Sequence, residues 1–329
     1  MIRALPALDP RVPAWDENGL LFRACPFCAH DGESVFRRPD ELLVNRCDYC
    51  GAYYVSPAPS AAVLEDFYSR YYSSHCTVEG SLSQGAASGD PCNDVRVREI
   101  VSNLGGRDLQ VCSVLDVGCG TGEMLNRFRQ LGARVAGVDL DPDAVRCANE
   151  KLGLECVRYG TLHDCPDCVD VVLMMDFIEH PVSPLDELKA AVRLLNPGGL
   201  LVLWTPSAAF AADEEHPVCF RVDLEHMQYL TAKTCMFLGT ALGLEVVHLE
   251  TVGFPVLAGH VEKIPRTGSG GLRAVFRGLK GALRKIGGQP GRRLMQAARV
   301  IVGTPKPPDL RDGRYHLFCI LRAAHNPVS

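Results

Sequence analysis

Short apolar runs alternate along the chain with stretches in which apolar residues recur at helical spacing. From about residue 95 onward, apolar runs of the kind found in buried strands cover residues 111–117, 134–139, 154–158, 169–175 and 200–204. Helices are predicted before and between these strands, over residues 94–104, 122–131, 142–151 and 185–195. Such regular alternation predicts an α/β fold in which helices cover both faces of a parallel sheet.

The N-terminal third of the chain follows other patterns. Residues 1–20 have no clear periodicity and are interpreted as a loose lead-in, whereas residues 61–72 have apolar and aromatic residues on one side of a predicted helix. Residues 73–93 are rich in Ser and Gly, which predicts a linker or a mobile lid. The main α/β domain is therefore expected to cover residues 94–329.

The turn after the strand at 111–117 carries the most informative residues. The apolar run ends in Asp116 and continues through Gly118 and Gly120 into the next helix. Glycine at these positions lets a ligand lie against bare backbone, where a Cβ would collide with it. Asp139 ends the next predicted strand, where it is placed to bind the two hydroxyls of a ribose. A carboxylate ahead of the glycines would repel a pyrophosphate and hold a ligand that carries an ammonium group.

This D-x-G-x-G-x-G turn resembles motif I of the class I S-adenosylmethionine-dependent methyltransferases. The segments VDVVLMMDFIEHP at 169–181, LLNPGGLLVLWTP at 194–206 and EHMQYLT at 225–231 are similar to the ubiquinone-biosynthesis-like, small-molecule branch of that family. The resemblance extends over about residues 110–252. It implies a doubly wound, Rossmann-like, seven-stranded methyltransferase sheet that ends in an antiparallel pair of strands.

The same resemblance implies where S-adenosylmethionine would bind. The matching residues are Asp116 (methionine ammonium, directly or through water), Gly118 and Gly120 (cofactor lining), Asp139 (ribose), Leu140 (adenine), Thr161 and Leu162 (adenine edge), and Met175 and Asp176 (methionine side). N-capping of the next helix is the structural alternative for an acidic residue here, and we assign that role to Asp141, ahead of Pro142.

Four cysteines near the N-terminus predict a metal site. Cys25 and Cys28 are followed by Cys47 and Cys50 in the pattern C-x2-C-x18-C-x2-C. Four soft thiolates in two close pairs match tetrahedral zinc, and a closed shell of four leaves no open position for catalysis. We therefore predict a structural zinc ribbon that, with the helix after it, covers residues 21–72. The arrangement resembles zinc-ribbon methyltransferases of glycan and natural-product pathways, whose N-terminal module tends to cap the active site.

Two histidines are candidates for a catalytic base. Methyl transfer from a sulfonium has a good leaving group, so the enzyme mainly positions the acceptor and excludes water. A hydroxyl acceptor also needs a base, and histidine suits that task near neutral pH. His180 and His226 follow successive predicted strands, which places both at the carboxyl edge of the sheet, where doubly wound folds bind ligands. A purely structural hydrogen bond is the alternative role of each.

Composition and charge narrow the choice of partner. Of 329 residues, 47% are hydrophobic and 22% are charged, which is typical of globular proteins. The net charge is −5, although residues 261–312 alone carry 12 basic and 3 acidic residues. An otherwise acidic body argues against binding nucleic acid over a broad surface. The absence of an N/D-P-P-Y/F motif and of a Pro-Cys nucleophile after residues 169–175 disfavours methylation of adenine amines and of pyrimidine C5.

The C-terminal part of the chain contains a basic insert. A helix predicted at 231–242 and a strand at 244–252 are separated by residues 254–313 from a final strand at 315–323. Within this insert, residues 272–286 have one apolar face and one face of Arg and Lys, as expected for a helix on an anionic membrane surface. Docking of this helix on the acidic body is the alternative.

The location of the protein is expected to be cytoplasmic. The first residues lack the apolar core of a secretory signal, and no apolar run is long enough to span a bilayer. The 15 cysteines are therefore expected to be reduced or bound to metal. If residues 272–286 bind lipid, the protein would also contact the inner membrane face.

These patterns together predict an S-adenosylmethionine-dependent methyltransferase that acts on a small molecule or glycan, with oxygen as the methylated atom. A lipid-linked acceptor becomes attractive if the basic helix binds a membrane. One alternative is a zinc-ribbon RNA methyltransferase of the rRNA guanine type, which combines the same two modules. Another is a non-catalytic module that keeps the cofactor pocket as a scaffold.

Overall fold

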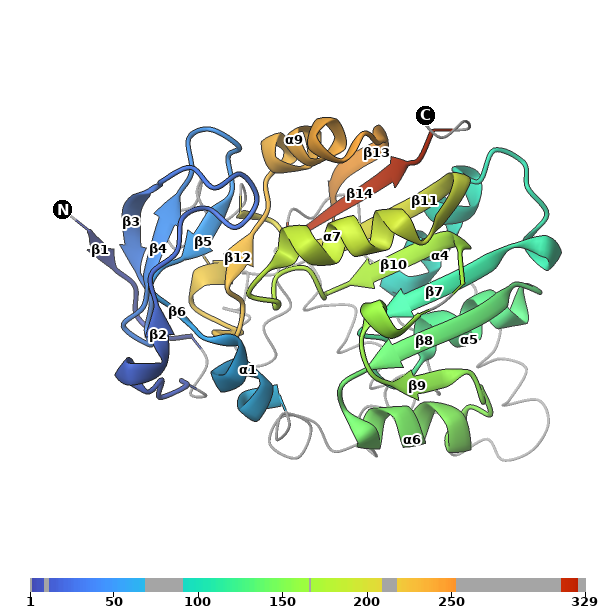
Figure 1. Cartoon of the computed structure of the whole chain (residues 1–329), viewed down its shortest axis with the longest axis horizontal. Helices are drawn as coiled ribbons and strands as arrows, with labels where there is room; N and C mark the ends of the chain where they lie inside the picture. Colours follow the sequence, from blue (N-terminus) through green and yellow to red (C-terminus); the bar gives the residue numbers. More distant parts are fainter. Residues whose placement is uncertain are drawn as a thin grey trace, which may run out of the picture.

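The chain forms a small N-terminal module beside a larger α/β domain (Figure 1). The structure is a computed structural model that describes residues 2–8, 12–68, 91–165, 167–208, 218–252 and 315–324, with the backbone alone for 91–95. The predicted helix at 272–286, the rest of the basic insert and most of the predicted linker at 73–93 lie outside these residues.

The larger domain is built on a seven-stranded sheet. Its strand order is β13-β14-β11-β10-β7-β8-β9. The strands are β7 (Ser113–Val117), β8 (Arg134–Asp139), β9 (Val157–Tyr159), β10 (Val169–Met175), β11 (Leu195–Pro206), β13 (Glu245–Val252) and β14 (His316–Arg322). All neighbouring pairs from β11 to β9 are parallel, whereas β14 is antiparallel to both β11 and β13. The predicted doubly wound methyltransferase sheet and its terminal antiparallel pair are thereby confirmed.

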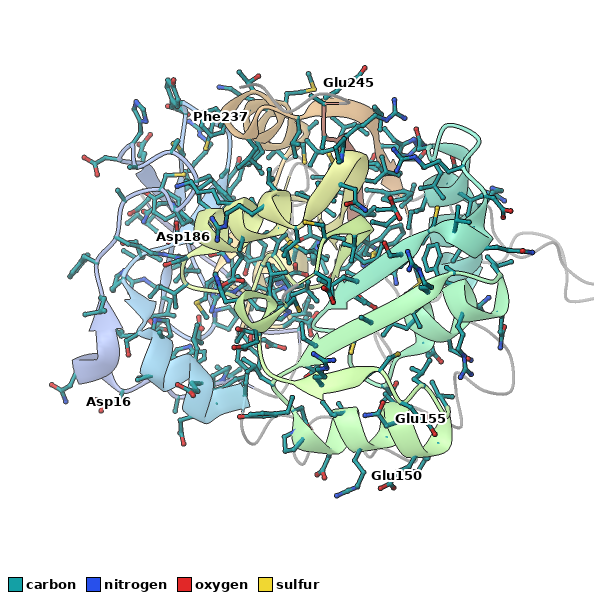
Figure 2. The ribbon with its side chains drawn as sticks, turned by 45° about the vertical axis from the view of Figure 1, so that its right-hand side comes forward. Asp16, Glu150, Glu155, Asp186, Phe237 and Glu245 are labelled. Atoms are coloured by element: carbon teal, nitrogen blue, oxygen red, sulfur yellow. The ribbon has the colours of Figure 1, made fainter. Side chains whose placement is uncertain are left out.

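Helices cover both faces of this sheet. One face carries α4 (Pro91–Ser102), α5 (Glu123–Gln130) and α6 (Pro142–Lys151), and the other carries α7 (Pro184–Arg193) and α9 (Ala232–Leu242). Because successive strand residues point to opposite faces, Val172 packs in one hydrophobic cluster and Leu173 in the other. Charged residues such as Glu150 of α6 and Asp186 of α7 point outward (Figure 2).

The N-terminal module has its own sheet, which borrows a strand from the larger domain. Its order is β1-β3-β4-β5-β12, formed by β1 (Arg3–Ala4), β3 (Glu33–Arg37), β4 (Leu43–Arg46), β5 (Tyr53–Val55) and β12 (Gln228–Tyr229). A separate pair, β2 (Leu20–Leu21) with β6 (Ala58–Pro59), precedes α1 (Ala61–Tyr68). In the chain, β12 follows β11 of the larger domain, yet it pairs with β5 of the N-terminal module. The two parts are therefore joined through this sheet as well as through the chain that connects them.

Short 3-10 helices complete the described structure. They are η1 (Glu17–Gly19), η2 (Leu109–Val111), η3 (Leu162–Asp164) and η4 (Val218–Phe220). In the part of the chain that the structure describes, no helix has the length and apolar content that a transmembrane span needs.

Two of the predicted strands differ from the structure by more than two residues at one end. The third strand covers Val157–Tyr159 rather than 154–158, because Gly153 adopts a left-handed backbone after α6 and the chain reaches the sheet later. β11 begins at Leu195 rather than at residue 200, because it includes residues 196–199 ahead of the predicted strand. The register steps from Val169 opposite Leu195 to Val171 opposite Leu200, so these residues form a bulge within the strand.

Candidate functional site

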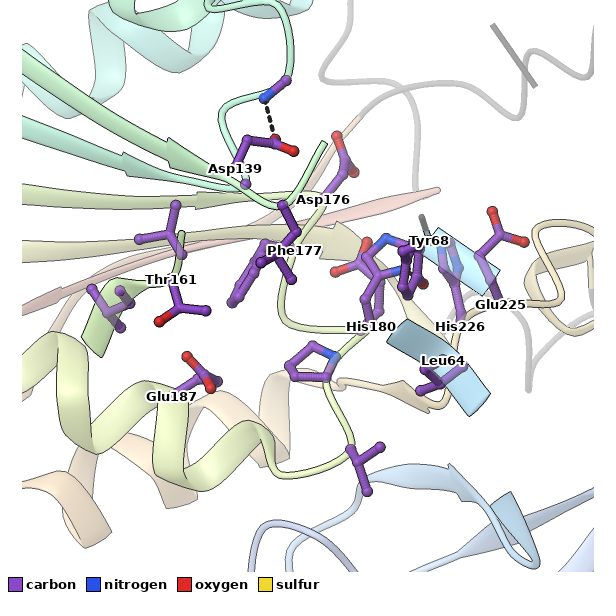
Figure 3. A pocket seen from close by; sticks show the side chains of 18 of the residues that line it. Leu64, Tyr68, Asp139, Thr161, Asp176, Phe177, His180, Glu187, Glu225 and His226 are labelled. Carbon is purple, nitrogen blue, oxygen red and sulfur yellow. Dashed lines mark hydrogen bonds between the residues drawn. The ribbon is translucent and has the colours of Figure 1, made fainter. Parts of the chain in front are cut away.

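A pocket of about 800 Å³ opens at the carboxyl edge of the sheet, facing α1 of the N-terminal module (Figure 3). Its walls come from the segments that follow β7, β8, β9 and β10, together with Pro206 at the end of β11. Parallel strands converge on this edge, which is where open α/β sheets bind ligands. Helix α1 adds Ala61, Leu64, Glu65 and Tyr68 to the lining.

The glycine turn after β7 forms one wall through its backbone. Gly118 has a φ of +69°, and a Cβ at this position would lie 2.8 Å from Cδ2 of Phe177. Gly120 also has a positive φ, of 53°, and both glycines line the pocket. The left-handed backbone and the close approach of Phe177 explain why glycine is required here.

Asp139 ties the end of β8 to the glycine turn while lining the pocket. Its Oδ2 accepts a hydrogen bond from the Gly120 N–H at 2.7 Å, and its Oδ1 accepts one from the Asp141 N–H at 2.8 Å. Each oxygen keeps a further lone pair that a ribose hydroxyl could use. Asp141 caps α6 by accepting from the N–H groups of Asp143 and Ala144, as expected.

Asp116 is buried and does not itself line the pocket. Its side-chain oxygen Oδ1 has no hydrogen-bond partner in the part of the chain that the structure describes, and the residue is 3% exposed. Burial and, to a smaller extent, the negative charge of Asp139 raise its pKa to about 8 against the opposing positive charge of Arg96. A buried carboxyl with an unused oxygen can accept a hydrogen bond from an ammonium group or from a water that bridges to one.

The other residues expected at the cofactor fall into two groups. Leu140, Thr161, Leu162 and Asp176 line the pocket, whereas Met175 is buried and does not. The Thr161 hydroxyl donates to Asp164 within η3, which fixes the loop after β9. The pocket therefore brings together the residues predicted for the adenine and the ribose.

Arg96 of α4 is a basic residue that the sequence did not indicate. Its guanidinium carbon lies 4.0 Å from the Trp204 ring centroid, and its Nη2 lies 3.3 Å from Oδ2 of Asp176. The side chain is 8% exposed, so its charge acts at low dielectric beside the predicted methionine end. The role of a single Arg in a helix cannot be predicted from the sequence, because only the folded structure places its side chain beside Trp204 of β11.

His180 and His226 meet in the pocket. Their ring centroids are 4.7 Å apart at an interplanar angle of 79°. Nδ1 of His180 lies 2.6 Å from the hydroxyl of Tyr68. Burial, followed by the charge of His226, holds the pKa of His180 well below its ordinary 6.5. A neutral imidazole is the form that can accept a proton.

β12 and two arginines hold the loops that carry these histidines. The Gln228 side chain donates to the carbonyls of Ile178 and Pro181, at 2.9 and 2.7 Å, on either side of His180. Arg38, whose side chain is fully buried, donates to the carbonyl of His226 at 2.6 Å. Arg23 bridges the carbonyls of Val182 and Met227. The N-terminal module thereby fixes both histidine loops.

Glu179 is a further residue of the site that the sequence analysis did not select. It is fully buried, and neither carboxylate oxygen has a hydrogen-bond partner among the described residues. One ligand atom from each of Glu179, His180 and His226 lies within 4.8 Å of the others. Burial and the charge of Asp176 raise the pKa of Glu179 well above its ordinary value. Two imidazoles and a carboxylate are a donor set that binds divalent cations.

The four N-terminal cysteines converge as predicted. Sγ of Cys25 lies 3.5 Å from Sγ of Cys50, Sγ of Cys28 lies 3.5 Å from Sγ of Cys47, and all four sulfurs lie within 4.8 Å of one another. A tetrahedral zinc with bonds of about 2.3 Å needs sulfurs about 3.8 Å apart. The cluster therefore fits zinc in both composition and spacing.

Comparisons with known proteins agree with this geometry. Residues 93–249 match the family model described as a methyltransferase domain. The chain is 37% identical over 131 residues to a ubiquinone biosynthesis O-methyltransferase of Xanthomonas oryzae, covering 36% of this chain and 53% of that protein. It is 34% identical over 108 residues to the mitochondrial ubiquinone biosynthesis O-methyltransferase of Schizosaccharomyces pombe, covering 30% and 39%.

These matches are partial. The chain spans about half the length of the first curated relatives that it matches. Among solved structures, it is similar to an S-adenosylmethionine-dependent methyltransferase from Archaeoglobus fulgidus, at 19% identity and a TM-score of 0.44. That similarity covers 74% of this chain and 98% of the other.

Proposed function

We propose that the chain, whose residues 93–249 match the model of a methyltransferase domain, transfers a methyl group from S-adenosylmethionine to a hydroxyl of a small molecule or glycan. One observation carries the proposal. The same pocket has a glycine-lined wall beside Asp139 and another wall that contains the half-buried His180 and the buried His226. The first suits a nucleoside cofactor, and the second suits an acceptor that must lose a proton.

In this proposal the chain positions both reactants and removes one proton. The cofactor, when bound, supplies an electrophilic methyl group on sulfur. Asp139 would hold its ribose, Asp116 its ammonium, and Leu140 its adenine. His180 would take the acceptor proton, since its lowered pKa keeps the imidazole neutral at pH 7. The buried walls exclude water, which would otherwise compete for the methyl group.

The charge of the pocket supports an uncharged or cationic acceptor. Eight of the lining residues are acidic, and no Lys or Arg lines the pocket among the residues that the structure describes. Phosphates and carboxylates would be repelled at such a surface. This supports a hydroxylated small molecule or glycan over the RNA alternative, whose backbone carries one negative charge per nucleotide.

A divalent cation is a second candidate for activating the acceptor. Glu179, His180 and His226 would hold it, and the buried carboxylate without a partner favours this arrangement. The cation would lower the pKa of a hydroxyl bound to it. Removal of weakly bound metal, with the zinc content of the protein measured in parallel, separates the two candidates. Activity that survives favours the histidine base, and activity restored by Mg²⁺ or Mn²⁺ favours the cation.

We also propose that the four cysteines bind structural zinc and that residues 272–286 contact an anionic membrane from the cytoplasmic side. The cysteine spacing supports the first, and the charge pattern of the sequence supports the second. Cosedimentation with vesicles that contain an anionic lipid tests the membrane contact. Binding that is lost when the Arg and Lys of this segment are replaced by Gln supports it, and no binding to such vesicles contradicts it.

Transfer of labelled methyl from S-adenosylmethionine into fractionated extract of the source cells tests the function. Label in the polar or lipid fraction supports the proposal, and a lipid product would favour the membrane-linked acceptor. Label confined to RNA would show that the acceptor is RNA and not a small molecule or glycan. His180→Ala is expected to bind the cofactor normally and to lose at least about 100-fold in kcat. Cofactor binding without turnover on any fraction would favour the scaffold alternative.

A further inference from the structure

Helix α1 reaches the pocket from the N-terminal module. Its first turn is anchored by the Ser60 N–H, which donates to the carbonyl of Gly19 at 2.9 Å, next to the β2–β6 pair. Leu64 packs in the core of the module, and the ring of Phe67 lies 5.4 Å from that of Trp15. The position of Tyr68, the last residue of α1, is therefore set by the core of the module, to which the larger domain also contributes residues such as Phe220 and Tyr315.

Tyr68 makes a direct contact with His180. The Tyr68 hydroxyl lies 2.6 Å from Nδ1, and the two ring centroids are 5.6 Å apart at 84°. Both residues line the pocket, and Figure 3 shows Tyr68 beside His180 and His226. A separation of 2.6 Å is a short hydrogen bond for this pair of atoms. The bond occupies Nδ1 and leaves Nε2 as the other ring nitrogen.

The two ring nitrogens of a neutral imidazole have opposite roles. One carries hydrogen and donates, and the other accepts, so the partner of one nitrogen selects the function of the other. If His180 is to take a proton at Nε2, then Nδ1 must carry the hydrogen and donate it to the Tyr68 oxygen. A phenolic oxygen can accept such a bond.

We propose that Tyr68 is a positioning residue of the transfer reaction: it accepts the Nδ1–H of His180 and so keeps Nε2 of that histidine unprotonated and ready to act as the base. This inference rests on the proposed function. In the step it serves, the acceptor O–H bond breaks as the O–CH3 bond forms. The proton goes to Nε2, and the electron pair of the broken S–CH3 bond stays on sulfur.

The bond to Tyr68 also stabilises the imidazolium that forms in this step. A hydrogen bond from a charged donor is stronger than one from a neutral donor. Among the groups around His180, His226 would oppose its protonation through its charge, whereas a hydrogen bond with the backbone of Asp176 favours it. The carboxyl of Glu179 lies beside His180 and would favour protonation only in its ionised form. Removing the Tyr68 hydroxyl is therefore expected to make His180 a weaker base without altering the cofactor wall.

Tyr68→Phe tests the inference while keeping the ring packed against Phe67. We expect kcat to fall by about 10- to 100-fold, KM for S-adenosylmethionine to change less than about twofold, and the acid limb of the kcat–pH profile to move to lower pH. Tyr49→Phe is the matched control, because Tyr49 belongs to the same module but is 57% exposed and stacks on His30. An unchanged kcat and pH profile in Tyr68→Phe would overturn the inference.

A second measurement does not depend on turnover. In protein labelled with 15N at histidine, the His180 signals, identified by comparison with His180→Gln, should report hydrogen on Nδ1 in the wild type and loss of this preference in Tyr68→Phe. Hydrogen on Nε2 in the wild type would contradict the inference. If no acceptor is ever methylated, the proposed function fails while this measurement still decides the role of Tyr68.

Discussion

Asp116 is buried and His180 is half-buried, and removal from water shifts their pKa values in opposite directions because it disfavours the charged form of each. At pH 7, Asp116 is thus largely protonated in the protein without ligand, and the imidazole of His180 is neutral. Binding of an ammonium group near Asp116 would stabilise its ionised form. Asp116 would therefore lose its proton when the ligand binds, while His180 would remain neutral and able to accept a proton.

The stability of the ligand-free protein should therefore depend on Asp116. Its pKa rises from 3.8 in the unfolded chain to about 8 in the folded one, so the folded state holds the extra proton between these pH values. The stability it contributes is complete below about pH 4 and is lost as pH rises through about 8. Asp116→Asn should remove this pH-dependent decrease in the free energy of unfolding, whose slope approaches about 1.4 kcal/mol per pH unit. Urea unfolding at pH 5.5 and 7.5 measures it, and equal pH dependence in both proteins would contradict the assignment.

Gly118 offers a test of the bare backbone wall. Gly118→Ala places a Cβ 2.8 Å from Phe177 at a φ of +69°, and should abolish cofactor binding as well as costing about 1–2 kcal/mol. Gly153→Ala is the control, because Gly153 has a φ of +59° with nothing within 4 Å of the added Cβ. Calorimetric titration with S-adenosylmethionine should show normal binding in the control. Normal binding in Gly118→Ala would refute the role of this wall.

At the scale of elements, β12 is the strand that connects the two parts of the chain. It pairs with β5 in the N-terminal sheet, while its Gln228 side chain holds the loop of His180. Arg38 and Arg23 hold the adjoining backbone from the other side. The loops that carry His180 and His226 are therefore positioned by β12 and by buried guanidinium groups of the N-terminal module.

Arg38 should affect stability and turnover separately. Arg38→Met leaves Asp40 buried without its ion-pair partner, which should cost about 3–5 kcal/mol. Adding Asp40→Leu should restore part of that stability but not kcat, since the carbonyl of His226 still lacks its hydrogen bond from Arg38. Denaturation and steady-state kinetics on the single and double variants measure both. Recovery of kcat together with stability would show that Arg38 acts only on folding.

The elements of the main domain could be predicted because their apolar patterns are local. β8, β10 and α6 have the predicted bounds, since each is a complete apolar run or helical period. β12 has only two residues and exists through a partner more than 170 positions away. A local pattern cannot contain that information.

The sequence likewise predicted some residues of the candidate site and missed others. Residues on the strand ends, such as Asp139 and His180, follow from the order of strands. Arg96, Tyr68 and Glu179 were missed because their roles depend on packing between distant elements or on burial that the sequence does not reveal.

At the scale of the whole molecule, the cysteine cluster and the pocket belong to one connected structure. Cys47 and Cys50 lie between β4 and β5, and β5 pairs directly with β12. The same hydrophobic cluster contains Cys50 and Leu115 of the central sheet. The cysteine cluster is thus connected to the histidine loops through packing and strand pairing.

Loss of zinc should therefore reduce activity as well as stability. Cys50→Ser should lower the zinc content, lower Tm by several degrees and reduce kcat, because binding of a structural zinc contributes directly to folding. Cys147→Ser is the control, since Cys147 is a buried cysteine of α6 outside the cluster. Metal analysis, thermal unfolding and kinetics measure the effects. Full zinc content in Cys50→Ser would contradict the four-cysteine site.

In the proposed function, S-adenosylmethionine binds at the carboxyl edge of the sheet with its ribose on Asp139. Calorimetric titration of the wild type, Asp139→Ala and Asp141→Ala with S-adenosylmethionine tests it most directly. We predict binding by the wild type, at least about 10-fold weaker binding by Asp139→Ala, and near-normal binding by Asp141→Ala, which loses only a helix cap worth about 1 kcal/mol. No binding by the wild type, or equal binding by all three proteins, would contradict the account.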